Sequence, residues 1–352
     1  MMNKQRGAVL ITVLVIVFIV MAIVSNLAVS NFRVIKRLTN QKIQSQAYAI
    51  LTAAVSFGRA GLGTSAATSP TDSLTDIWAQ PLPKASVMDD IEMGGYITDA
   101  QSKFNINDLV TNGNINPNVL NQFTLLLSNL NLPQGIASNI AYYMVSPSNQ
   151  GDIMNQYTMG TPAYRPAGRQ LIDLSELLLV KGVQSSWLYK LNQYVTVIPP
   201  TNFNYAFGQN ESSTNESGVA SNKPPVPANA PASSYGTGLQ VNVNTASAEV
   251  ISAKSGIPLQ VAQRMVATRQ SKVFASTGDI TNFLTSNGVI LSQTGSQGQE
   301  QKINPATLSV TSSYFTIHAV VDSGSDEFRW IALVYRQNRS GQWPRILWQH
   351  PE

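Results

Sequence analysis

The chain has 352 residues, a formal net charge of +4, two histidines and no cysteine. Without cysteine, disulfides, thiolate metal sites and cysteine nucleophiles are excluded, and two histidines are too few for most histidine-based metal or triad chemistry. Basic residues on either side of an N-terminal apolar run account for more than the net charge. The rest of the chain is therefore close to neutral, which argues against strong nucleic-acid binding.

Residues 8–29 form an apolar run that directly follows a short basic segment ending at Gly7. Its polar residues are uncharged, namely Thr12, Ser25 and Asn26. Since a helix of about 20 apolar residues crosses the hydrocarbon core of a bilayer, the run predicts a transmembrane helix. A cleaved signal peptide is the alternative, but it would have a shorter apolar core followed by a small-residue cleavage site. The run instead passes into a helix-compatible stretch, residues 31–57.

The charges around this span leave its orientation open. Lys4 and Arg6 favour a cytoplasmic N-terminus under the positive-inside rule. A second basic group follows the span at a distance where the same rule counts it, and comprises Arg33, Lys36, Arg37 and Lys42. Charge alone therefore does not decide the topology.

Beyond the span, apolar residues recur mostly every three to five positions, which predicts an amphipathic continuation of the helix. The predicted apolar stripe comprises Phe32, Ile35, Leu38, Ile43, Ala47, Ile50, Ala54 and Phe57. One continuous helix from Ala8 to about Phe57 would be about 75 Å long at a rise of 1.5 Å per residue. We expect its first half to lie in lipid and its second half to pack on a soluble domain.

The basic leader ending in Gly7, the apolar helix from Ala8 and the amphipathic extension together resemble the type IV pilin-like proteins. The resemblance implies that a prepilin peptidase cleaves between Gly7 and Ala8 on the cytoplasmic side and methylates the new N-terminus at Ala8. The family usually has Glu at the fifth position of the mature chain, where this chain has Thr12. That departure is typical of the K-type minor pseudopilin of type II secretion systems, and it suits a terminal subunit better than one in the middle of a filament.

Four patterns predict the elements of the soluble part. Residues 60–84 are rich in small residues and proline and predict an exposed connection, and residues 94–99 predict a strand entering a turn. The low-complexity stretch 201–237 predicts a mobile loop. An antiparallel meander is predicted for three segments, 314–321, 328–335 and 345–349.

About 200 residues between the first strand and the meander have a mostly helical pattern that contains a weak internal repeat. The corresponding segments are 104–109 with 239–246, 132–140 with 256–265, and 171–177 with 274–280. Asn, Ser or Asp is expected to cap a helix start in each unit. The repeat suggests a duplicated small helical module.

The motifs of this insertion, taken in order, again resemble the K-type pseudopilin: Asp99 with 104–107, then 164–166, 173–177 and 241–246. The resemblance implies an α+β, pilin-like fold with a long N-terminal transmembrane and amphipathic helix and a C-terminal antiparallel sheet. A large, mostly α-helical inserted domain with SAM or helix-hairpin-helix-like repeats interrupts this fold. The expected divisions are a leader (1–7), a transmembrane segment (8–29), a first pilin-like part (30–104), the inserted domain (105–305) and the C-terminal sheet (306–352).

The same resemblance implies a structural role at the tip of a periplasmic pseudopilus, where the protein would initiate assembly for the export of folded proteins across the outer membrane. The implied partners are minor pseudopilins of I, J and H type, the prepilin peptidase and the inner-membrane assembly platform. The chain would be a single-pass inner-membrane protein with its C-terminal domain in the periplasm.

The second repeat also resembles a DNA-binding helix-hairpin-helix module, which keeps open a minor pilin of a type IV pilus or competence system. The turn of such a module binds phosphate through main-chain N–H groups, but here it contains Pro258, which has none. Nearby basic residues are few: Lys254, Arg264, Arg269 and Lys272. A structural module is therefore favoured, and no nucleic acid is expected.

Members of the family can bind calcium, and the corresponding stretch here, residues 142–157, retains Asp152 as its one carboxylate. Because calcium takes six to eight oxygen ligands, several of them carboxylates, Asp152 is a weak calcium candidate and an ordinary polar loop is favoured. The acidic group Asp89, Asp90 and Glu92 is interpreted as a solvated turn, and His318 as a packing or surface residue. No nucleophile–base pair is evident, so we expect no enzymatic activity.

Overall fold

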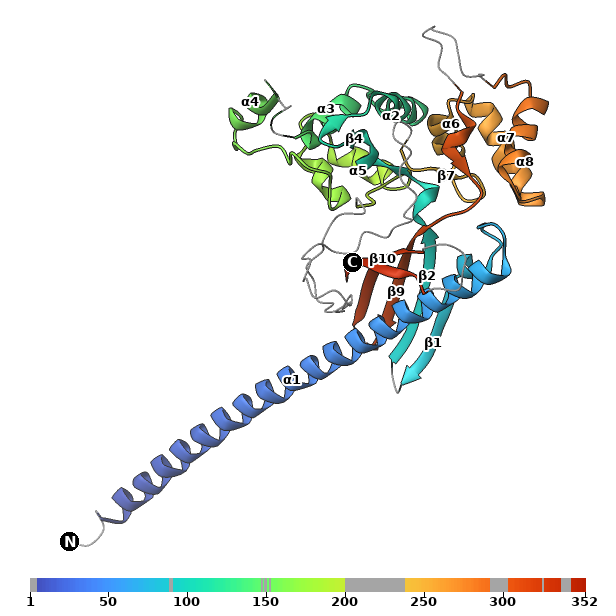
Figure 1. Cartoon of the computed structure of the whole chain (residues 1–352). Coiled ribbons are helices and arrows are strands. Elements are labelled where there is room, and N and C mark those ends of the chain that lie inside the picture. Colours follow the sequence, from blue (N-terminus) through green and yellow to red (C-terminus); the bar gives the residue numbers. More distant parts are fainter. Residues whose placement is uncertain are drawn as a thin grey trace, which may run out of the picture.

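The computed structural model describes residues 5–88, 91–146, 148, 151, 153–199, 238–291, 303–324, 326–336 and 343–352. A single long helix, α1 (Gln5–Thr68), projects from two packed bodies (Figure 1). The sheet body consists of the C-terminal part of α1 and a five-stranded sheet. The helical body is formed by the chain between the second and third strands of that sheet in sequence order. The predicted mobile loop, 201–237, lies outside the described residues.

The sheet is antiparallel throughout, with the strand order β1-β2-β9-β10-β11. Its strands are β1 (Leu82–Met88), β2 (Ile91–Asp99), β9 (Tyr314–Asp322), β10 (Glu327–Tyr335) and β11 (Arg345–Pro351). The predicted C-terminal meander is confirmed as β9, β10 and β11. The central strand β9 pairs with β2 on one side and β10 on the other, so the sheet joins segments that lie far apart in the sequence.

Helix α1 packs its C-terminal part across one face of this sheet (Figure 1). Its residues in the core of the sheet body are Ala47, Ile50, Leu51, Ala54, Val55 and Leu62, and they meet alternate residues of β9, namely Phe315, Ile317, Ala319 and Val321. At Gly58 an added Cβ would lie 3.1 Å from the side chain of Ile317, so glycine permits the close approach of helix and sheet.

The predicted apolar stripe of α1 is only partly correct. Phe32, Ile35 and Leu38 are exposed because α1 contacts the sheet body only from about Ala47 onward. Phe57 is also 62% exposed, because its position on the helix faces away from the sheet.

The prediction of an exposed connection over residues 60–84 was wrong. Helix α1 continues to Thr68, and Leu62, Ala66 and Trp78 are buried. Packing against the sheet offsets the low helix propensity of the Gly and Thr residues there. The segment ends inside β1, an edge strand of the sheet whose seven residues are all exposed.

The helical body is built from short helices around one apolar core that runs from Phe104 to Val310. Its α-helices are α2 (Pro117–Asn129), α3 (Ile136–Met144), α4 (Ile153–Thr158), α5 (Ser185–Leu191), α6 (Ala248–Ser255), α7 (Leu259–Ser271) and α8 (Thr277–Ser286). Its two-residue strands are β3 (Phe104–Asn105), β4 (Val110–Thr111), β5 (Asn114–Ile115), β6 (Val195–Thr196), β7 (Val241–Asn242) and β8 (Leu308–Ser309). The 3-10 helices among the described residues include η1 (Ile77–Ala79), η2 (Ala100–Ser102), η3 (Ile106–Leu109), η5 (Leu174–Leu179) and η6 (Pro305–Thr307).

The two copies of the internal repeat have the same architecture. Strand β3 pairs in parallel with β6 in the first copy, and β7 pairs in parallel with β8 in the second. Each pair brings the start of its copy next to the end of that copy. Between them, α2, α3 and η5 in the first copy correspond to α6, α7 and α8 in the second, and the first copy contains α4 and α5 in addition.

Buried asparagines repeat this correspondence at the level of single hydrogen bonds. The Asn107 side chain accepts a bond from the N–H of Leu171 at 2.8 Å and donates to its carbonyl oxygen at 2.9 Å. Asn244 makes the same two bonds to Phe274, both at 3.0 Å. The asparagine therefore fixes the segment that precedes η5 in the first copy and α8 in the second.

Capping follows the same plan. A capping box formed by Asp173 and Glu176 begins η5, and one formed by Ser276 and Asp279 begins α8. Such boxes satisfy backbone N–H groups that the first turn leaves without intrahelical partners. The prediction that Asn, Ser or Asp caps a helix start in each unit is confirmed: Asn116 and Asp173 do so in the first copy, and Ser247 and Ser276 in the second.

Candidate functional site

The first candidate site is the free part of α1. Among the described residues, α1 is the one helix long and apolar enough to cross a membrane, and its most apolar stretch is not buried by other parts of the chain. Gly7 and Ala8, the predicted processing site, lie within α1. The apolar side chains along this stretch have no cover in the protein, and a hydrocarbon environment would supply it.

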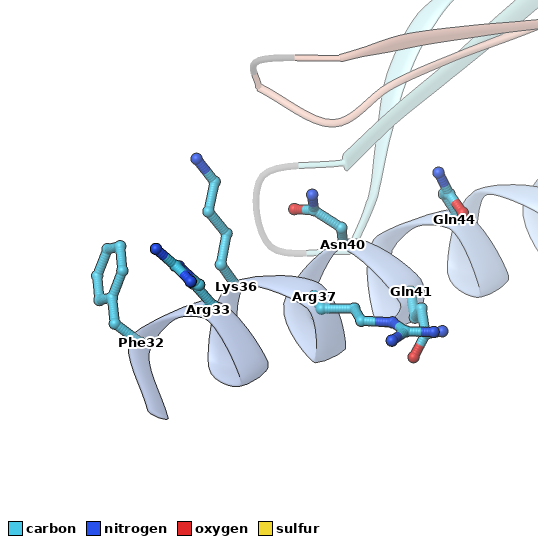
Figure 2. A pocket seen from close by; sticks show the side chains of 7 residues that line it. All are labelled: Phe32, Arg33, Lys36, Arg37, Asn40, Gln41 and Gln44. Atoms are coloured by element: carbon cyan, nitrogen blue, oxygen red, sulfur yellow. The ribbon is translucent and has the colours of Figure 1, made fainter. Parts of the chain in front are cut away.

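A basic segment follows the apolar stretch on the same helix. A shallow groove on its surface is lined by Phe32, Arg33, Lys36, Arg37, Asn40, Gln41 and Gln44 (Figure 2). Arg33, Lys36, Arg37 and Lys42 are all exposed. The first carboxylate in the whole sequence is Asp72, so α1 itself offers these cations no acidic partner.

The second candidate site is a buried polar junction that connects the sheet body to the helical body. At its centre an Arg336 Nη donates to the Asp72 carboxylate at 2.6 Å, and both side chains are at most 2% exposed. Arg336 also donates to the carbonyl oxygen of Ser312 at 2.7 Å, and its guanidinium lies over the ring of Phe315. These contacts tie the loop after α1 to the sheet.

Asp99, at the end of β2, extends the junction into the helical body. Its Oδ2 accepts from the hydroxyls of Thr245 and Ser312, both at 2.6 Å, and from the Asn242 amide at 3.2 Å. Its Oδ1 accepts from the N–H of Gln101 at 2.8 Å. Burial raises the pKa of Asp99 to about 6, although these hydrogen bonds favour the ionised form. Asp99 was singled out from the sequence as part of a motif, and the structure gives its contacts.

Asn242 makes the junction continuous, because it belongs to the first strand of the second repeat. Its amide group donates to the carbonyl oxygen of Asp72 at 3.0 Å and to the hydroxyl of Ser312 at 2.9 Å, in addition to Asp99. The second repeat is therefore bonded directly to both acidic residues. Such a connected, buried polar network favours one fixed arrangement of the two bodies.

A buried lysine joins the two repeats to each other. Lys254 in α6 is 1% exposed, and its Nζ lies 3.7 Å from an Asp108 carboxylate oxygen and over the ring of Phe104. Burial lowers the pKa of Lys254, and Asp108 opposes that shift. Asp108 also accepts a bond from the N–H of Leu239 at 2.6 Å, so one carboxylate serves both copies.

The structure reduces the basic surface available to the competing DNA-binding interpretation. Of the four basic residues near the helix-hairpin-helix turn, Lys254 is buried, and Arg269 donates to the carbonyl oxygens of Val243 and Ala246. Arg264 remains exposed, as does Lys272. Sequence shows the charge of a residue but not its burial, which explains why Lys254 looked available.

The remaining candidates from the sequence do not converge on a site. Asp152 lies outside the described residues, as do Asp89 and Asp90. Within the described ranges, no group of three or more His, Cys, Asp or Glu side chains could hold a metal ion. His318 stacks on Tyr96 with ring centroids 4.4 Å apart, and burial lowers its pKa.

Comparison with known proteins gives two family matches inside the chain. Residues 102–200 match the first-domain model and residues 241–301 a second model of the type II secretion system protein K. The chain is 28% identical over 302 residues to the type II secretion system protein K of Pseudomonas aeruginosa, and the aligned region covers 82% of this chain and 79% of that protein. It is also 28% identical over 212 residues to the Klebsiella pneumoniae protein of the same name, and that aligned region covers 56% of this chain and 64% of the relative.

A solved structure matches the fold over most of the chain. It is a chain in the crystal structure of the GspK-GspI-GspJ complex from the enterotoxigenic Escherichia coli type 2 secretion system. The TM-score is 0.60 at 18% identity, and the match covers 90% of this chain and 99% of that one. At this identity the likeness establishes the fold.

A long apolar N-terminal helix that packs on an antiparallel sheet is a pilin-like architecture, and the present chain has this fold. Its family matches and its relatives are type II secretion system K proteins. It is a minor pseudopilin of that system, and α1 fits a single-pass membrane anchor.

Proposed function

We propose that this minor pseudopilin forms the tip of the pseudopilus together with subunits of I and J type, and that the resulting complex initiates pseudopilus assembly. The similar protein of known structure was crystallised as a complex of K, I and J subunits, which supports the same partnership here. The assembled filament would act in the export of folded proteins from the periplasm across the outer membrane. H-type pseudopilins would then follow the tip complex.

The observation that carries the proposal is the position of the helical body. It lies beyond the sheet, at the opposite end of the molecule from the N-terminus of α1 (Figure 1). If α1 runs along a filament axis, a subunit stacked above this one would meet the helical body. The buried junction of Asp72, Arg336, Asp99 and Asn242 would hold that body in place. The structure thus suits a terminal position, as does the absence of the usual Glu at Thr12.

The route to the membrane follows from the same assignment. We propose that the leader is cytoplasmic, that a prepilin peptidase cleaves between Gly7 and Ala8, and that Ala8 is then methylated. The soluble domain would lie in the periplasm, with α1 held in the inner membrane beside the assembly platform until filament growth begins. Residues 105–305 would act as the inserted domain and perform no catalysis.

Co-purification tests the partnership most simply. The full chain, co-expressed with I- and J-type pseudopilins and extracted in mild detergent, is expected to form a complex with one copy of each. A soluble domain that recovers duplex DNA but neither pseudopilin would refute the proposal and favour the competence-type alternative.

A further inference from the structure

The exposed basic face of α1 directly after the apolar run has no role in the packing of the protein. Arg33, Lys36 and Arg37 form this basic cluster, and their spacing of three and four residues places them on one side of the helix. Figure 2 shows the Arg33 and Lys36 side chains extending away from the helix and the Arg37 side chain lying along it. Among the described residues, no ion pair joins any of them to a carboxylate.

The depth of the cluster matches the boundary of a bilayer. Arg33 lies four residues beyond Val29, the end of the apolar run, which is about 6 Å at the helical rise. Arg37 lies about 12 Å beyond Val29 on the same measure. The headgroup layer on each side of the hydrocarbon core is about 5–7 Å thick. Long basic side chains at such a depth can reach this layer while the helix remains inserted.

Apolar side chains alternate with the basic ones over the same residues. Phe32 is 69% exposed, Ile35 is 62% exposed and Leu38 is 59% exposed. This part of α1 therefore suits a place where an apolar environment lies on one side of the helix and anions lie on the other, at the same depth in the membrane. The boundary between acyl chains and acidic headgroups supplies both together, whereas an acidic protein surface supplies only the anions.

We propose that the basic cluster of Arg33, Lys36 and Arg37 binds the phosphate groups of acidic phospholipids in the leaflet where α1 leaves the membrane. Binding there would fix the depth of α1 and hold the sheet body, which first contacts α1 near Ala47, at a set height above the bilayer. This inference rests on the membrane anchoring of α1, and it is independent of the proposed position at the filament tip.

Lipid retention by the full chain tests the proposal. The protein is reconstituted into vesicles of phosphatidylcholine with one-fifth phosphatidylglycerol, re-extracted in mild detergent, and the retained lipids are quantified by mass spectrometry. The test variant is R33Q/K36Q/R37Q. The matched control is R165Q/R264Q/K272Q, which loses the same charge at exposed positions of the helical body.

The wild-type chain and the control variant are expected to enrich phosphatidylglycerol over the input ratio. Each basic residue near an acidic surface changes binding by about fivefold, so the test variant is expected to lose at least fivefold of that enrichment. Raised salt is expected to lower the wild-type value in the same way. The conservative variant R33K/K36R/R37K keeps the three charges and is expected to retain the enrichment.

Equal enrichment in the wild-type chain and the test variant would overturn the proposal, as would an equal loss in the control variant. Unchanged lipid retention combined with loss of I- and J-type subunits would assign the cluster to a protein contact and overturn it as well. Alkaline carbonate extraction separates this failure from a failure of anchoring, because a correctly anchored chain stays in the membrane fraction.

Discussion

The buried pair of Asp72 and Arg336 allows the stability of the junction to be tested quantitatively. The substitution Arg336→Met removes the guanidinium but leaves the Asp72 carboxylate, which is 0% exposed, without its cation. Breaking a buried pair by removing one partner costs about 3–5 kcal/mol. At about 2–4 °C per kcal/mol for a domain of this size, the unfolding midpoint is expected to fall by about 10 °C.

The assay is thermal unfolding of a fragment that begins at residue 43, because residues 10–42 are almost entirely exposed and do not contribute to the apolar core. The matched control is Arg329→Met on β10, the strand that ends directly before Arg336. Arg329 pairs with Glu327 at 2.6 Å, but its side chain is 58% exposed, so its loss is expected to change the unfolding midpoint little. The double variant D72N/R336M is expected to recover part of the lost stability.

Two results would refute this reasoning. One is a destabilisation by Arg336→Met no larger than that of Arg329→Met. The other is a double variant less stable than R336M alone, because neutralising Asp72 should relieve the uncompensated buried charge. Either result would mean that the pair does not carry the attachment of the helical body.

Three further predictions concern the helical body and its attachment. Asn107→Ala and Asn244→Ala are each expected to destabilise by about 1–3 kcal/mol by chemical denaturation, because each loses both bonds to a buried backbone segment. Asn107→Ala is expected to cost at least as much as Asn244→Ala, since Asn107 also donates to the carbonyl oxygen of Ile198 at 3.1 Å. Burial raises the pKa of Asp99 from 3.8 to about 6, so Asp99 contributes fully to stability below pH 3.8, and this contribution is lost as the pH rises through 6. Denaturant titrations are therefore expected to show the free energy of unfolding fall by about 3 kcal/mol over that range. Gly238→Ala is expected to lower the unfolding midpoint, because the added Cβ would lie 2.6 Å from an Asp108 carboxylate oxygen and the φ angle is +70°.

Each of these predictions has its own control. Asn282→Ala, at an exposed position of α8, is expected to leave stability nearly unchanged. A loss of stability equal to that of Asn107→Ala or Asn244→Ala would contradict the role given to the buried asparagines. Asp99→Asn is expected to flatten the pH dependence between 4 and 6, and an unchanged slope would assign it to another group. Gly61→Ala, where an added Cβ meets nothing within 4 Å, is expected to be neutral or stabilising; a Gly238→Ala variant as stable as that control would contradict the steric argument.

Patterns that are local in the sequence predicted the structure well. The apolar run of α1 and the alternation in β9 and β10 depend on neighbouring residues, so both could be recognised without tertiary information. The continuation of α1 to Thr68 could not, because its Gly and Thr residues form a helix only with the support of the sheet. The edge strand β1 was missed for the same reason.

The junction was mostly hidden from sequence reasoning. Asp72 and Arg336 are separated by 264 residues, and neither belongs to a recognisable motif. Asp99, by contrast, was visible because it precedes a patterned segment. The repeated asparagines were visible too, because the duplicated chain shows the same residues twice, although their bonds to Leu171 and Phe274 appear only in the structure.

Labelling of assembled pseudopili tests the central claim most directly. The chain has no cysteine, so Tyr189→Cys in α5, at a position that is 80% exposed on the helical body, would provide a single thiol for a gold-linked maleimide. A terminal position for this subunit predicts one label at one end of each filament in electron micrographs. Labels distributed along the filaments would contradict that position.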